Sequence, residues 1–99
     1  MSFVVIARYV TNPGKRDEVL DLLAPMVAAS LAEPGCRRYG LHAGTDDGVV
    51  AIVEEYDTEA DFTAHCESEH FKRIVLGQVV PLLAERVVTR CVPVAGADA

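Results

Sequence analysis

The sequence predicts an α+β domain of the ferredoxin-like type, with a split β-α-β-β-α-β order and a four-stranded antiparallel sheet. The first observation is the order of patterns along the chain: strand, long helix, two strands, broken helix and strand. The second is composition, because 99 residues of which 51% are hydrophobic suit one compact domain and not a disordered chain. We therefore expect a single domain over residues 1–94 and a loose C-terminal tail over 95–99.

The first strand and the long helix are predicted from the N-terminal third of the chain. Residues 3–10 are rich in β-branched and aromatic side chains, and both faces of this strand carry apolar residues. Asn12 suits the N-cap of a helix and Pro13 its first turn. Apolar residues then recur at helical spacing over 19–31, where Pro25 should kink the helix because proline removes a backbone donor. A Pro-Gly pair ends the helix.

Two strand-like runs, residues 36–43 and 49–56, are joined by a turn at 44–48 rich in glycine and aspartate, and they should form a hairpin. Residues 49–53 are apolar on both faces of their strand, as in the first strand. The helices of one chain can cover only one face of the sheet, so a second copy should cover the other. We therefore expect a homodimer.

The last third of the chain should hold a broken helix and the final strand. Thr58 and Asp61 have the spacing of a capping box that opens a short helix. Ser68 suits the cap of a second short helix, which reaches about Gly77. Residues 86–94 return to strand-like composition.

Charge and cysteine content exclude several classes of function. The formal net charge is −6 and no basic run exceeds the pair Arg37-Arg38, so we expect no nucleic-acid partner. The cysteines are odd in number and form no Cys-x-x-Cys pair, which fits a reducing cytoplasm. The short apolar start meets a charge at Arg8, which predicts a strand and neither a signal peptide nor a membrane span.

Candidate functional residues gather around the junction of the third strand and the following helix. Strand alternation places Glu54 and Tyr56 on one apolar face. In the helix, Phe62 lies one turn before His65, so burial should lower the pKa of His65 and leave it a neutral base. Taken alone, His65 fits a structural histidine bonded to a backbone carbonyl better than a catalytic base.

The neighbouring residues also have two interpretations each. His70, just inside the second short helix, is either a functional imidazole or a capping or dimer-contact residue. Glu54 either orients a histidine or pairs with Arg8 or Arg90. Phe71 fits the core better than a substrate-binding surface.

The sequence predicts no metal and no cofactor. His65 and His70 are five residues apart across a predicted helix break, which matches neither a zinc helix nor a facial triad. His42 belongs to no pattern, and no phosphate-binding or dinucleotide-binding motif occurs in the chain.

Four spaced motifs resemble the antibiotic biosynthesis monooxygenase family, including its quinol monooxygenase-like members. They are Glu33-Pro34-Gly35-Cys36 before Tyr39, Glu54-x-Tyr56, Ala64-His65 and Ser68-x-His70-Phe71. The resemblance implies a homodimer in which two sheets pack into an α+β barrel, with a pocket between sheet and helices in each subunit. Characterised members include cofactor-free oxygenases of quinols and anthrones, haem-degrading enzymes and a sugar-phosphate isomerase.

The family chemistry is most compatible here with cofactor-independent oxygenation of a small hydroxyaromatic by O₂. Haem degradation is disfavoured, because Tyr56 stands where tryptophan is usual and the first strand has no asparagine. Alternatives are a noncatalytic small-molecule-binding or structural dimer, and an isomerase. The expected roles are a base for His65, a donor to the substrate oxygen for Tyr56, a second donor or acid for His70, orientation for Glu54 and substrate contact for Phe62 and Phe71.

Overall fold

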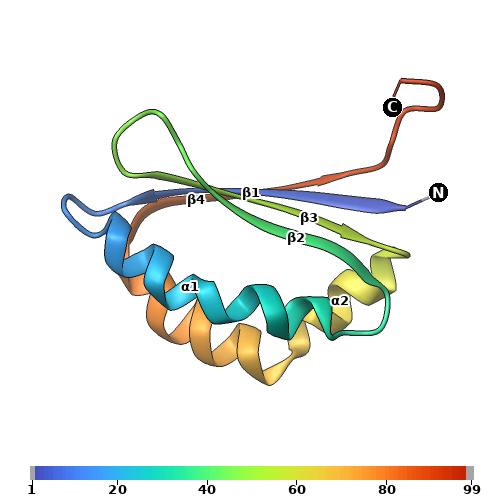
Figure 1. Ribbon diagram of the computed structural model, residues 1–99, viewed down its shortest axis with the longest axis horizontal. Helices are drawn as coiled ribbons and strands as arrows, with labels where there is room; N and C mark the ends of the chain where they lie inside the picture. Colours follow the sequence, from blue (N-terminus) through green and yellow to red (C-terminus); the bar gives the residue numbers. More distant parts are fainter. Residues whose placement is uncertain (1, 98–99) are drawn as a thin grey trace.

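A computed structural model describes residues 2–97, and it confirms the predicted fold class. The helices lie together on one face of the sheet, and the opposite face carries none of them (Figure 1). The elements are β1 (Phe3–Thr11), α1 (Arg16–Leu31), β2 (Cys36–Ala43), β3 (Val49–Tyr56), α2 (Glu59–Glu67), the π-helix η1 (Phe71–Val79), the short 3₁₀ helix η2 (Val80–Leu82) and β4 (Leu83–Cys91).

The sheet has the strand order β2-β3-β1-β4, and every neighbouring pair is antiparallel. Strand β1 is central and pairs along its length with β3, from Phe3 opposite Tyr56 to Val10 opposite Val49. Its other neighbour is β4, an edge strand. Residues directly opposite one another on neighbouring strands have side chains on the same face of the sheet. The β3 and β4 residues opposite the buried positions of β1 therefore face the helices.

The long helix begins later than predicted. Asn12 is not its N-cap, because the carbonyl of Asn12 accepts a hydrogen bond from the Lys15 N–H at 3.0 Å in a turn. Gly14 has a φ of 76°, which a right-handed helix cannot contain, so α1 starts at Arg16. The helix then continues through Pro25, which lies on its exposed side.

The broken helix has the predicted caps. The Thr58 side chain accepts from the Asp61 N–H, and the Asp61 carboxylate accepts from the Thr58 N–H at 3.1 Å. Ser68 has an extended backbone, and its hydroxyl accepts from the Phe71 N–H at 3.3 Å. The second segment is a π-helix that extends past the predicted end at Gly77.

Strand β4 begins and ends three residues before the predicted limits of 86 and 94. Its register explains the shift, because Cys91 already lies opposite Val4, near the start of β1, and little of β1 remains to pair beyond it. The predicted tail 95–99 lies partly outside the described residues; within them, Ala97 donates to the Val94 carbonyl in a turn at Gly96. No helix among residues 2–97 has the length and hydrophobicity needed to cross a bilayer.

The core lies between the sheet and the helices. Its buried aliphatic and aromatic side chains come from β1, α1, β2, β3 and η1, among them Ala7, Tyr9, Val19, Leu23, Met26, Val50, Ile52, Ile74, Val75 and Val79. Phe62 of α2 belongs to a smaller adjoining cluster with Phe3, Val5 and Tyr56. On the opposite face, β1 and β3 carry mainly apolar side chains as predicted, and in the single chain this face is open: Ile6 is 44% exposed and Val87 of β4 is 48% exposed.

Candidate active site

Glu54 and Tyr56 enter the site from the end of β3. They share the helix-facing side of the strand with Val50 and Ile52, and both are buried. The Tyr56 hydroxyl donates a hydrogen bond of 2.6 Å to Oε1 of Glu54. Burial raises the pKa of Glu54 to about 7, although the hydrogen bond from Tyr56 opposes this shift. Glu54 therefore exchanges its proton close to neutral pH.

His65 lies in the last turn of α2 between two carboxylates and is only 2% exposed. Its Nδ1 atom is 3.1 and 3.0 Å from the two oxygens of Glu33, and its Nε2 atom is 3.8 Å from Oε1 of Glu54. Burial lowers the pKa of His65, and the charge of Glu33 only partly offsets this. An ionised carboxylate can only accept, so Nδ1 carries the proton and Nε2 presents a lone pair toward Glu54.

Glu33 is the main site residue that the sequence reasoning missed. It lies in the loop between α1 and β2, 32 residues before His65 in the chain. The loop needs glycine at position 35 for two reasons. The φ of Gly35 is 85°, and a Cβ there would lie only 2.4 Å from the Asp61 carboxyl carbon. The loop therefore docks against the start of α2, and Glu33 lies beside His65. Its one signal in the sequence was the Glu-Pro-Gly motif.

His70 converges on the same carboxylate. Its Nε2 atom contacts Oε2 of Glu33, and its ring centroid is 6.1 Å from that of His65. The break between the two helical segments at Ser68 makes this possible, since two residues five apart on one continuous helix would not face a common point. Spacing along the sequence does not reveal this convergence.

Glu33, His65 and His70 could together hold a metal ion. Each offers one ligand atom, and these atoms lie within 4.8 Å of one another. Two imidazoles and one carboxylate are a ligand set that several transition metals accept. The same atoms hydrogen-bond to one another, which satisfies them without an ion.

Aromatic rings enclose His65. The ring centroids of four side chains lie 5.3 to 6.2 Å from that of His65: Phe71, Tyr39, Tyr56 and Phe62. Phe62 and Phe71, expected to contact substrate, are both buried and pack in the core, while Tyr39 was not foreseen. These rings exclude water from the imidazole, which is the physical cause of its lowered pKa.

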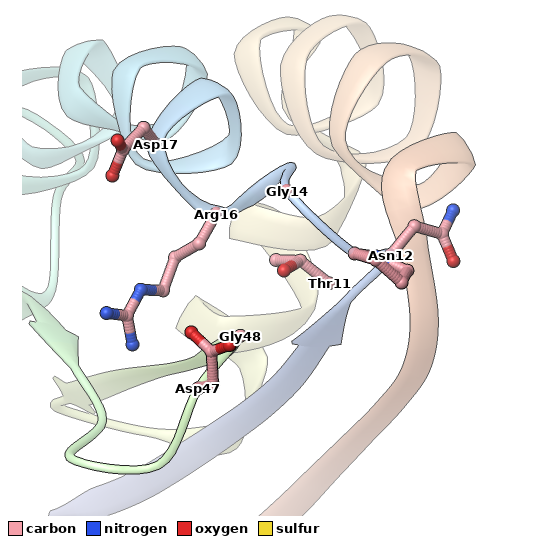
Figure 2. Close-up of a pocket in the computed structure, with 8 residues that line it drawn as sticks. Thr11, Asn12, Gly14, Arg16, Asp17, Asp47 and Gly48 are labelled. Atoms are coloured by element: carbon pink, nitrogen blue, oxygen red, sulfur yellow. The ribbon is translucent and has the colours of Figure 1, made fainter.

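A separate hollow of about 440 Å³ lies at the other end of β3, and none of the candidate residues lines it. Figure 2 shows Arg16 reaching from the start of α1 toward the β2–β3 hairpin, with Asp47 nearby. The Arg16 guanidinium donates to the carbonyls of Gly44 at 2.9 Å and Asp46 at 3.2 Å, so it fastens the hairpin. The candidate residues therefore lie in the buried cluster, away from this hollow.

The fold and this cluster define a class: small ferredoxin-like α+β domains with an acid–base cluster buried between sheet and helices. Within that class, the chain belongs to the antibiotic biosynthesis monooxygenase family, whose profile matches residues 2–75.

Individual relatives agree with this assignment. A Mycobacterium tuberculosis protein named "Putative monooxygenase Rv0793" is 34% identical over 67 residues, a match that covers 68% of this chain and 66% of that protein, just under two thirds of its length. The structure of Rv0793 matches with a TM-score of 0.89 at 31% identity, covering 99% of this chain and 100% of that chain. A structure of PA3566 from Pseudomonas aeruginosa matches with a TM-score of 0.86 at 28% identity, covering 95% of each chain.

Proposed function

We propose that the protein is a cofactor-independent monooxygenase that oxidises a quinol- or anthrone-type hydroxyaromatic with O₂. The observation that carries the proposal is the placement of His65, a neutral imidazole held by Glu33 on one side and facing Glu54 on the other. Membership of the monooxygenase family supports the reaction type. The substrate class rests on the ability of an electron-rich hydroxyaromatic anion to donate an electron to O₂ without a cofactor.

The reaction needs no electrons from the protein. A base removes a proton from the hydroxyaromatic, and the resulting anion donates one electron to O₂. The two radicals combine into a peroxide on the ring carbon, and loss of water leaves a carbonyl there. One oxygen atom of O₂ enters the product and the other leaves as water, while the substrate supplies all four electrons.

The buried cluster provides groups for these steps. Nε2 of His65 accepts the substrate proton, and Glu33 stabilises the imidazolium that forms. The hydroxyl hydrogen of Tyr56 is donated to Glu54 in the resting site. When Glu54 carries its own proton and donates it to the Tyr56 oxygen, Tyr56 is free to donate to the substrate oxygen that becomes negative. His65 is almost fully buried, so substrate reaches Nε2 only when the covering side chains move aside.

A noncatalytic role competes with this function, and one observation favours it. Nδ1 of His65 and the Glu33 oxygens already satisfy one another in a buried network, as in a structural cluster. Product analysis with a panel of quinols and anthrones under O₂ separates the two roles. Conversion to the carbonyl product at a rate that depends on His65 supports the oxygenase, and no conversion across the panel supports the binding or structural role.

We also propose that the protein acts as a homodimer in the cytoplasm. The apolar outer face of the sheet, including Ile6 and Val87, supports the dimer, because burying such a face is favourable. The three cysteines are free, which suits a reducing compartment.

A further inference from the structure

Two arginines of β4 lie on the side of the sheet that carries the site. Arg86 is opposite Tyr9 and Arg90 is opposite Val5 in the register with β1, and both of these β1 residues are buried against the helices. The helices make their main contacts with β2, β3 and one another, whereas β4 packs mainly against β1. The two arginines are therefore exposed beside the helical layer.

Each guanidinium lies over an aromatic ring of the core. Cζ of Arg86 is 5.8 Å from the ring centroid of Tyr9, and Cζ of Arg90 is 5.7 Å from that of Phe62. A guanidinium over a ring keeps N–H groups at its edge that can donate. Arg86 uses part of this capacity in a hydrogen bond to the Tyr9 hydroxyl, which opposes the rise of the Tyr9 pKa caused by burial. Among residues 2–97 neither arginine forms an ion pair, although the chain has 15 acidic and only 9 basic residues.

The arginines adjoin the candidate catalytic groups. Arg90, Val5 and Glu54 form one row across three neighbouring strands, so the backbones of Arg90 and Glu54 are about 10 Å apart. The Phe62 ring under Arg90 also contacts the rings of His65 and Tyr56. Between the arginines, Val88 packs against the core on the same face and provides an apolar surface.

We propose that Arg86 and Arg90 bind an anionic oxygen group on the aromatic substrate, which places its ring over Val88 and its hydroxyl group toward Glu54. The proposal rests on the proposed function for the identity of the reaction, and it adds that the substrate is an anion. Two stacked guanidiniums without acidic partners provide donors that match a carboxylate or a phosphate. A neutral quinol would leave these donors unused.

The test is a binding measurement with three probes that share one ring system: 1-naphthol, 1-hydroxy-2-naphthoate and 1-naphthyl phosphate. Their fluorescence is well resolved because the protein has no tryptophan. We expect at least one of the two anions to bind about tenfold or more tightly than 1-naphthol, as a charge-assisted hydrogen bond allows. The preferred anion identifies the group as carboxylate or phosphate.

Variants assign the preference to these residues. Arg86→Gln and Arg90→Gln should each remove most of the preference for the anion and weaken 1-naphthol binding much less than anion binding. The control is Arg73→Gln, which makes the same charge change on η1 and should keep the preference. Equal binding of all three probes by the unchanged protein, or an unchanged preference in the folded Arg86→Gln/Arg90→Gln protein, would overturn the proposal. The measurement needs no turnover, so an anion preference in a protein without oxygenase activity would sink only the proposed function.

Discussion

Nδ1 of His65 lies 3.0 Å from Oε2 of Glu33, although the two residues belong to α2 and to the loop before β2. This contact fixes the tautomer of a buried imidazole and directs its basic nitrogen toward Glu54. Most of the proposed chemistry depends on it. Glu33 is a positioning residue in this account, because it acts through His65.

Replacing Glu33 by glutamine tests that relationship. The charge of Glu33 raises the pKa of His65 against the effect of burial, so Glu33→Gln should lower that pKa further. The acid limb of the kcat/KM profile should then move to lower pH, and turnover should fall by roughly 10- to 100-fold. Glu69→Gln, a change at an exposed acid, is the matched control. A fall in turnover with an unmoved pH profile would mean that Glu33 only supports the fold.

Glu54 should make the stability of the protein depend on pH. Its pKa in the folded state is raised to about 7 from 4.5, so the folded state binds its proton more tightly than the unfolded chain does. The contribution is therefore complete below about pH 4.5 and is lost as pH rises through about 7. Glu54→Gln removes it, and the difference between the two proteins should change by up to about 3 kcal/mol between pH 4.5 and 8.

Urea unfolding of both proteins across that range measures the effect. His65 titrates in the opposite sense, since its lowered pKa means that stability is lost as pH falls below the unfolded value of 6.5. That effect is largely common to both proteins and cancels in their difference. Parallel curves of unfolding free energy against pH for the two proteins would contradict the prediction, because they would mean that the pKa of Glu54 does not change on folding.

The open sheet face should hold two copies together. Light scattering should give twice the 10.7 kDa mass of one chain at micromolar concentration. Ile6→Lys should yield monomers, because it places a charge in the buried apolar contact. Leu76→Lys is the control, since Leu76 is 46% exposed on the helical side and Ile6 is 44% exposed on the sheet. A monomeric unchanged protein would remove the argument for the dimer.

Purified protein should contain no stoichiometric metal. The ligand atoms of Glu33, His65 and His70 are close enough to hold an ion, so elemental analysis is a direct check. We expect less than about a tenth of an equivalent of zinc or iron, because the mutual hydrogen bonds satisfy these groups without an ion. A full equivalent that is lost in His70→Ala would make this cluster a metal centre and would replace the base assigned to His65.

The sequence predicted the parts of the site that depend on local periodicity. Alternation along β3 placed Glu54 and Tyr56 together, and helical spacing placed Phe62 beside His65. Glu33 and Tyr39 were missed as neighbours of His65 because they come from a loop and a different strand, and no local period relates them to α2. These contacts depend on tertiary packing.

The same distinction applies to the fold. The hairpin and the capping box at Thr58 follow from short-range rules, and both were predicted. The start of α1 was wrong because Gly14 adopts a positive φ, which Asn12 and Pro13 do not reveal. The π-helical winding of η1 also has no signal in the apolar spacing.

The most direct test of the account is the turnover of His65→Ala with a quinol or anthrone substrate that the unchanged protein oxidises, measured as O₂ uptake and product formed. We expect a loss of about a hundredfold or more, because a positioned base contributes 10² to 10⁴. Tyr56→Phe should cost less, since one hydrogen bond to a charged oxygen contributes roughly 1.5 to 3 kcal/mol. His42→Ala, which changes an exposed histidine outside the cluster, should remain active. A folded, dimeric His65→Ala protein with unchanged turnover would contradict the account and leave His65 as a structural histidine.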